Sequence, residues 1–136
     1  MNAVDTNVLI YVNDPRDPAK QRIASELVSN LVDGVLIWQV ACEYLAASRK
    51  LAQIGFSQKQ AFERVREMSE VWPLFVPKME VLDKAENLLQ RFSLSFWDAT
   101  LVAACIQAGI QQIYTEDFSG YPNIDGVEII NPFQTA

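Results

Sequence analysis

Histidine is absent from the 136 residues of this chain. Its absence excludes Ser-His and Cys-His catalytic pairs and the common zinc sites. Any general acid or base must therefore be Asp, Glu, Lys, Tyr or a metal-bound water. Cysteine is scarce as well, since only Cys42 and Cys105 occur, and they form no metal or redox motif. Both lie in predicted apolar helices, so we expect them to be small core residues in a reducing cytoplasm.

Basic residues are also few. Eleven Lys and Arg stand against 17 Asp and Glu, which gives a formal net charge of −6. This balance excludes a module that grips nucleic acid through an overall basic surface. It does not exclude a metal-dependent nuclease, because the cation supplies the positive charge at the phosphate. No apolar run approaches the roughly 20 residues needed to cross a bilayer, and no signal sequence is recognisable. We expect a soluble, cytoplasmic protein that does not bind a membrane.

The residues that are present predict one α/β domain covering residues 1–136. Half of the chain is hydrophobic, which excludes a disordered protein. Short apolar segments at 3–4, 35–37, 74–76, 113–115 and 127–130 predict strands. The segments between them carry helical signals: a helix is expected at 39–50, and capping residues mark helix ends at Asp17, at Ser57 with Gln60, and at Gly109. A loop of turn-forming residues is expected at 119–123. This alternation predicts a three-layer α/β/α fold with a short, mainly parallel central sheet.

Three carboxylates stand alone in apolar surroundings. Asp5 is the only charged side chain from Met1 to Asn13, Glu43 the only one in 34–48, and Asp98 the only one in 92–115. An ionised carboxylate in such a setting costs several kcal/mol unless something pairs with it. The economical way to neutralise all three is to gather them around one cation. Ligation by carboxylates alone favours Mg²⁺ or Mn²⁺ over zinc or copper.

A fourth acid fits the same site. Ligands of open α/β folds bind at the carboxyl ends of the strands. Asp5 ends the first predicted strand, Asp117 follows the strand at 113–115, and Asp98 lies in the first turn of its helix. All four carboxylates could therefore reach one edge of the sheet, where without metal they should raise one another's pKa values. Glu116 competes with its neighbour, and we favour Asp117 at the site with Glu116 in a supporting role.

Each acid also has a purely structural interpretation. Asp98 could complete a capping box with Ser95, and Asp5 could form an Asx-type turn at the end of its strand. Glu43 could extend along its helix toward Arg49 or Lys50. The large aromatic side chains are most simply core residues: Trp38, Trp72, Phe75, Phe92 and Trp97.

Together these motifs resemble the PIN-domain family, particularly the VapC-type toxins of bacterial toxin–antitoxin pairs. The matching stretches are Asp5-Thr6-Asn7, Glu43 on its apolar helix, Trp97-Asp98-Ala99, Thr115-Glu116-Asp117-Phe118 and the closing Ile129-Ile130-Asn131-Pro132-Phe133.

The resemblance implies a Mg²⁺- or Mn²⁺-dependent endoribonuclease that acts on RNA, forms a homodimer and is held in check by a small antitoxin protein. In it, Asp5, Glu43, Asp98 and Asp117 map onto the family's acidic quartet. Asn7 and Thr115 map onto polar positions that orient those acids.

Two other functions are compatible with the same residues. The first is a catalytically silent PIN-like binding module, whose acidic pocket receives a basic side chain from a partner protein. The second is an aspartyl-phosphate phosphatase built on Asp5, which is the weaker hypothesis because Asn7 stands where such enzymes carry a second acid.

Overall fold

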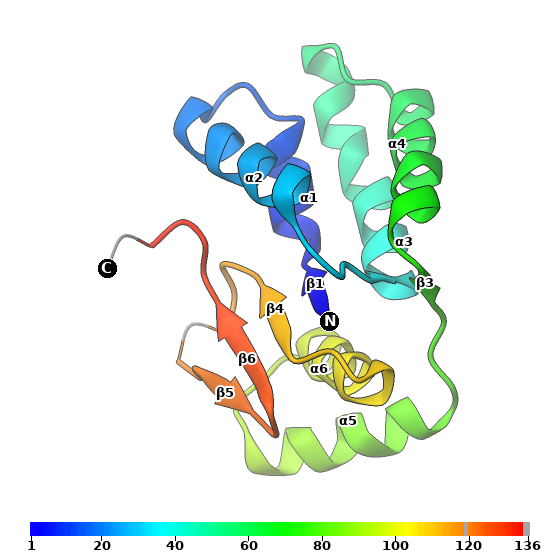
Figure 1. The fold of residues 1–136 in the computed structure, drawn as a ribbon, viewed down its shortest axis with the longest axis vertical. Helices are drawn as coiled ribbons and strands as arrows, with labels where there is room; N and C mark the ends of the chain where they lie inside the picture. Colours follow the sequence, from blue (N-terminus) through cyan, green and yellow to red (C-terminus); the bar gives the residue numbers. More distant parts are fainter. Residues whose placement is uncertain (119, 135–136) are drawn as a thin grey trace.

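A computed structural model of the chain describes residues 1–118 and 120–134. Strands and helices alternate as predicted (Figure 1). The elements in chain order are β1 (Asn2–Val4), α1 (Thr6–Val12), α2 (Pro18–Asn30), β2 (Leu36–Ile37), α3 (Trp38–Ala47), the 3₁₀ helix η1 (Ser48–Ile54), α4 (Gln58–Val71), β3 (Leu74–Phe75), α5 (Glu80–Arg91), α6 (Phe96–Ala108), β4 (Gln112–Tyr114), β5 (Asn123–Ile124) and β6 (Val127–Ile130).

The strands form a mainly parallel central layer. Four of them pair in the order β1-β4-β6-β5, and β2 pairs with β3. All of these pairs are parallel except β5 with β6. A bridge between Asn2 and Gly34 links β1 to the segment that leads into β2. Helices α1 to α4 lie on one side of the strands and α5 and α6 on the other, which confirms the predicted three-layer arrangement (Figure 1).

This topology has a switch point beside β1. The chain leaves β1 toward β2 on one side, whereas β4 pairs with β1 on the other. In doubly wound folds the crevice at such a point, at the carboxyl ends of the strands, is where ligands bind. Asp5 follows β1 directly, and Thr115 follows β4.

Local capping signals explain where the helices begin and end. The Asp17 side chain accepts a hydrogen bond from the Lys20 amide at the start of α2, with Pro18 in the first helical position. Ser57 and Gln60 form the predicted capping box of α4. Helix α6 starts at the cap residue Ser95 and ends at Gly109, whose φ of 74° is in the left-handed region that glycine adopts without strain.

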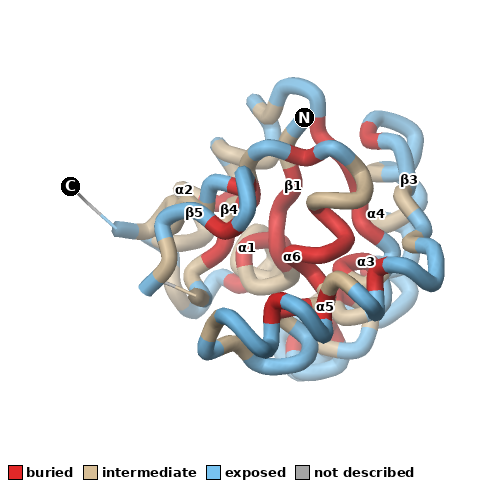
Figure 2. Tube along the Cα trace, turned by 90° about the horizontal axis from the view of Figure 1, so that it is seen from below, coloured by how far each residue is buried: buried red, intermediate tan, exposed pale blue. Residues whose placement is uncertain are grey.

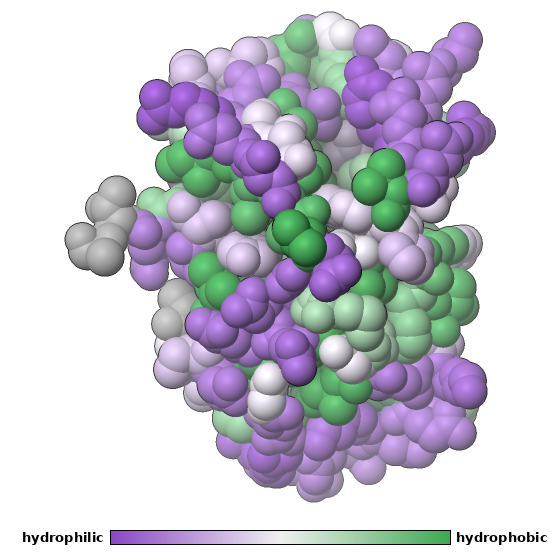
Figure 3. Space-filling view, in the orientation of Figure 1, coloured by the Kyte–Doolittle hydropathy of each residue, from purple (hydrophilic) through white to green (hydrophobic). Residues whose placement is uncertain are grey.

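The core is formed by β1, β2, α6 and the inner faces of the other helices (Figure 2). Buried residues of α6 include Leu101 to Cys105, so this helix is enclosed over most of its length, as its composition predicts. Helix α5 is amphipathic: Val81, Ala85 and Leu88 are buried, while the surface over it is predominantly hydrophilic (Figure 3). Among the described residues, no helix combines the length and hydrophobicity that a membrane span requires.

Several aromatic and thiol predictions are wrong. Trp72 is a core residue, 5% exposed, but Trp38 and Trp97 are 50% and 63% exposed. Cys105 is buried as predicted, whereas Cys42 is exposed. Trp38 and Cys42 lie four residues apart on α3, on the face opposite to the buried Val40, Ala41 and Tyr44. An apolar composition conceals which face of such a helix is buried.

Two segment predictions also need correction. The helix predicted at 39–50 ends at Ala47 and continues as the 3₁₀ helix η1. In the loop predicted at 119–123, Asn123 opens strand β5, whose Ile124 is buried; Ser119 lies outside the described residues. A two-residue strand among turn formers carries no periodic signal that could identify it.

Candidate acidic active site

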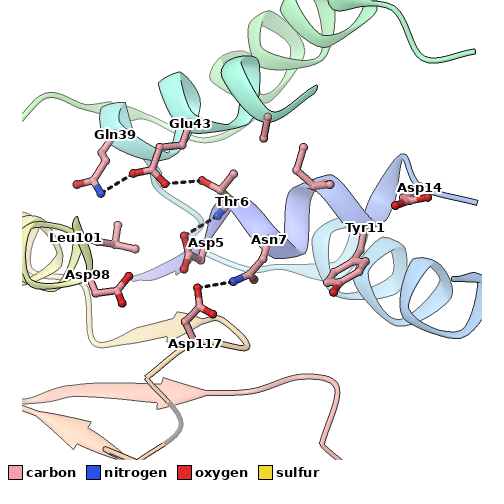
Figure 4. Close-up of a pocket in the computed structure, with 12 residues that line it drawn as sticks. Asp5, Thr6, Asn7, Tyr11, Asp14, Gln39, Glu43, Asp98, Leu101 and Asp117 are labelled. Atoms are coloured by element: carbon pink, nitrogen blue, oxygen red, sulfur yellow. Dashed lines mark hydrogen bonds between the residues drawn. The ribbon is translucent and has the colours of Figure 1, made fainter. Parts of the chain in front are cut away.

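A cleft of about 420 Å³ lies at the switch point of the sheet. The four predicted acids line it, and in Figure 4 Asp5, Asp98 and Asp117 surround its centre while Glu43 approaches from α3. None of the described residues that line it is Lys or Arg. The lining consists of Asp5, Thr6, Asn7, Ile10, Tyr11, Asp14, Gln39, Glu43, Ala47, Asp98, Leu101 and Asp117.

Asp5 is the most buried of the four acids, with 5% of its surface exposed. It caps α1, because its Oδ1 accepts a hydrogen bond of 2.7 Å from the Thr6 amide. Its Oδ2 accepts a bond of 2.8 Å from the Thr115 hydroxyl. Burial raises the pKa of Asp5 to about 6 although both hydrogen bonds lower it, and the charges of Asp117 and Glu43 raise it further. Asp5 therefore caps α1 and lines the cleft at the same time.

Asp98 projects into the cleft from the first turn of α6. Ser95 caps this helix by accepting a bond of 3.1 Å from the Asp98 amide. The reciprocal bond of a capping box, from the Ser95 amide to the Asp98 carboxylate, is absent among the described residues. Burial raises the pKa of Asp98, the Ser95 side chain lowers it, and the charges of Asp117 and Glu43 raise it. The carboxylate is thus available to the cleft.

Glu43 reaches the cleft from the middle of α3. Its Oε1 accepts a bond of 2.7 Å from Gln39, one turn earlier on the same helix. The same Gln39 amide nitrogen donates to the Trp97 carbonyl at 3.0 Å, which ties α3 to the start of α6. Thr6 approaches the other Glu43 oxygen at 3.4 Å. Glu43 therefore faces the site rather than Arg49 or Lys50.

Asp117 is held by α1 and by the end of β4. Asn7 donates from Nδ2 to Asp117 Oδ2 at 3.1 Å and to Thr115 Oγ1 at 3.2 Å. The Asp117 amide donates to the same Thr115 hydroxyl at 3.0 Å. The fully buried Thr115 thereby joins Asp5 to Asp117. Asn7 and Thr115 therefore contact the acids that the resemblance expects them to orient.

Glu116 points away from its neighbour and is not among the residues that line the cleft. Its two carboxylate oxygens accept bonds from the Tyr11 hydroxyl at 2.8 Å and from Lys20 Nζ at 2.9 Å. Of the two adjacent acids, Asp117 is therefore the one that faces the site.

Sequence reasoning missed some residues of the cleft. Gln39 and Thr6 are uncharged and carried no signal of their own. Asp14 stood in a loop beside Pro15 and Arg16, which is ordinary turn composition. Its carboxylate is held by the Arg16 side chain at 2.9 Å through both oxygens, and this contact lowers the pKa of Asp14. Among the described acids that line the cleft, Asp14 alone forms a salt bridge.

The chemistry of the donors fits a hard divalent cation. Five carboxylates line the cleft, of which Asp14 is paired with Arg16, and the Asn7 Oδ1 and Gln39 Oε1 oxygens are buried without a hydrogen-bond partner among the described residues. Such oxygens suit Mg²⁺, Mn²⁺ or their bound water. Among the described residues, however, no three acidic or thiol side chains converge closely enough to hold a metal ion as they stand. Binding would require the carboxylates to draw together, which their mutual repulsion opposes in the absence of a cation.

Comparison with known proteins identifies the family. The PIN domain model matches residues 3–125. No curated protein sequence matches the chain.

Similar solved structures include FitAcB from Neisseria gonorrhoeae, with a TM-score of 0.74, 17% identity, and coverage of 99% of this chain and 100% of the other. A toxin–antitoxin complex from Klebsiella pneumoniae has a TM-score of 0.72, 17% identity and the same coverage. VapC20 from Mycobacterium tuberculosis, described as a toxin that cleaves the sarcin-ricin loop, has a TM-score of 0.70 and 21% identity, and 92% of this chain and 98% of the other are covered. These likenesses establish the fold, and the family model covers nearly the whole chain: this protein belongs to the PIN domain family.

Proposed function

We propose that this protein is a divalent-metal-dependent endoribonuclease and the toxin of a toxin–antitoxin pair. One observation carries the proposal: Asp5, Glu43 and Asp98, each isolated in the sequence, line one cleft at the switch point of the sheet. Asp117 lines it with them, and no Lys or Arg of the described residues does. Burial and charge repulsion raise the pKa of Asp5 to about 6, as expected for an acid cluster that lacks its counterion.

The residues of the chain have distinct roles in this proposal. Asp5, Asp98 and Asp117, with Glu43, would hold Mg²⁺ or Mn²⁺. A bound ion would supply a water molecule of lowered pKa as the nucleophile for the phosphodiester and positive charge to offset that of the phosphate. Asn7 and Thr115 keep Asp117 and Asp5 at fixed separations through their hydrogen bonds. Gln39 orients Glu43 by donating a hydrogen bond to its carboxylate. Without histidine, the chain offers no imidazole as general acid or base.

Asp98→Asn tests the catalytic assignment. We expect the variant to lose RNA cleavage but to fold normally. Burial raises the pKa of the Asp98 carboxyl, so replacing the ionised carboxylate with a neutral amide should not destabilise the fold. Cleavage of total RNA by the purified chain is measured with Mg²⁺, with Mn²⁺ and with EDTA. Asp83→Asn, on the exposed surface of α5, is the matched control and should cleave normally. Full Mn²⁺-dependent activity in Asp98→Asn would refute the assignment.

Metal binding is tested separately from activity. Mn²⁺ that binds only the folded state should raise the melting temperature of the wild type, and the rise should increase with the logarithm of the Mn²⁺ concentration above the dissociation constant. The rise should be much smaller in Asp5→Asn and Asp98→Asn. A chain that shows neither cleavage nor a metal-dependent rise, yet binds an arginine-rich peptide that Asp98→Asn does not bind, would favour the silent binding module instead.

The same proposal includes two protein partners, a small antitoxin and a second copy of the chain. It draws on the solved structures of similar fold, which include toxin–antitoxin complexes. It also draws on the exposure of large apolar side chains, Trp97 and Trp38 among them, which a monomer would leave in water. Light scattering of the purified chain measures its mass, and a value for one chain at micromolar concentration would refute the homodimer.

A further inference from the structure

Glu116 and Asp117 are adjacent in sequence but have opposite environments. Asp117 lines the acidic cleft, and Glu116 does not. Helix α1 holds both acids: Asn7 donates to Asp117 at 3.1 Å, and Tyr11, one turn further along, donates to Glu116 at 2.8 Å. Residues four apart lie on the same face of a helix. One helix face therefore fixes which of two neighbouring acids enters the cleft.

Lys20 of α2 completes the contact with Glu116. Its Nζ lies 2.9 Å from Glu116 Oε2 and 3.2 Å from the Tyr11 hydroxyl. The Lys20 side chain is 34% exposed and that of Glu116 26%, so this ion pair is shielded from water more than a surface pair. The hydrogen bonds that Lys20 donates to Glu116 and Tyr11 raise the pKa of its amine, which stays charged at neutral pH.

Phe133, which follows β6, packs against this group. The Lys20 ammonium lies 4.8 Å from the centre of the Tyr11 ring and 5.3 Å from that of Phe133. The two rings meet edge to face at 5.1 Å. A cation over aromatic faces is held electrostatically, and more strongly where water is partly excluded. Phe133 follows the segment matched by the family model, so the matched region alone does not supply all of these contacts.

Release of Glu116 would change the acidic site. Glu116 is one residue from Asp117, which lines a cleft where burial, and to a smaller extent neighbouring negative charge, already raise the pKa of Asp5 and of Asp98. An unpaired Glu116 could turn inward or displace its neighbour through the shared backbone. We therefore propose that Lys20, with Tyr11, is a positioning residue: by holding Glu116 outside the cleft, it sets the position of Asp117. This inference rests on the proposed nuclease function for its catalytic consequence, but the positioning itself is independent of it.

Lys20→Met tests the inference, with Lys84→Met as the matched control. Lys84 pairs with Asp125 at 2.8 Å and its side chain is also 34% exposed, but it lies on α5 and is not bonded to Glu116 or Tyr11. In metal-free protein, the side-chain amide signals of Asn7 in a nitrogen–proton correlation spectrum report the position of Asp117. They should shift in Lys20→Met and stay in place in Lys84→Met.

The same variants also test Mn²⁺ affinity and the kinetics of RNA cleavage. Loss of a residue that orients a metal ligand lowers affinity or activity by about 10–100-fold. We expect that loss in the Mn²⁺ affinity and kcat of Lys20→Met, with KM for RNA little changed, and recovery of most of it in Lys20→Arg. Lys20→Met/Glu116→Gln should be less impaired than Lys20→Met, because the neutral amide no longer repels Asp117.

The outcomes separate the two proposals. If the wild type fails to cleave RNA, the nuclease function is wrong, and the Asn7 signals still decide the positioning role. If those signals do not move in Lys20→Met, Lys20 is only a surface ion pair and the inference is overturned. Equal losses of activity in Lys20→Met and Lys84→Met would overturn it too, since both would then reflect general destabilisation.

Discussion

Asp5→Asn should make the metal-free protein more stable at neutral pH and remove its proposed activity. The pKa of Asp5 is about 6 in the folded state, whereas the unfolded state releases the proton near the ordinary aspartate value of 3.8. Stability from this group is therefore greatest below about pH 3.8 and falls as the pH rises to about 6. Because a tenfold change in proton affinity is worth about 1.4 kcal/mol, the ionised Asp5 destabilises the fold at neutral pH by about 3 kcal/mol.

The asparagine recovers only part of this energy. Its amide nitrogen replaces one oxygen, and both oxygens of Asp5 accept hydrogen bonds. The Thr115 hydroxyl already accepts from Asn7 and from the Asp117 amide, so it has no lone pair for a further donor. One mismatched polar contact of this kind costs about 1–2 kcal/mol. The net gain at about pH 7.5 is then about 1–2 kcal/mol, since the lost charge outweighs the mismatch.

Denaturant unfolding in EDTA measures this difference. The gain should vanish between about pH 5 and pH 4, because the folded wild type, in which the pKa of Asp5 is about 6, has by then taken up its proton. Asp83→Asn, an exposed position on α5, should show no comparable pH dependence. If the stability difference between Asp5→Asn and wild type is the same at about pH 7.5 and about pH 4, Asp5 is not a buried, ionised carboxylate at neutral pH, and the account of the acidic cleft is wrong.

The remaining predictions concern the packing that supports the cleft. Gly34→Ala should destabilise the protein by about 1–3 kcal/mol, because a Cβ there would lie 2.5 Å from Trp72 Nε1. Thermal unfolding measures this loss. Gly120→Ala is the neutral control, since no atom lies within 4 Å of the added carbon. Trp72→Ala should lower stability by about 3–5 kcal/mol, and Trp97→Ala by less than about 1 kcal/mol, because their exposed fractions are 5% and 63%. Similar losses in both tryptophan variants would contradict the burial described for Trp97.

The sequence by itself determined the fold class and the identity of the acids. Alternating short strands and capped helices required a layered α/β domain, and the caps at Asp17, Ser57 and Gly109 are where the pattern placed them. The lone charges of Asp5, Glu43 and Asp98 were visible because a carboxylate in an apolar segment needs a reason to be there. These signals are local, so they can be read without knowledge of the rest of the chain.

Only the tertiary structure decided how the acids are held. Neither Glu116 nor Asp117 has a local feature that places it in the cleft; contacts from Lys20 and Asn7, about a hundred residues away, separate the two. Gln39 and Thr6 joined the site through partners on other elements, and Trp97 became a surface residue because nothing in the described chain covers the start of α6. Composition reports what each segment can bury, but which face is covered and which carboxylate is paired depend on contacts between segments distant in sequence.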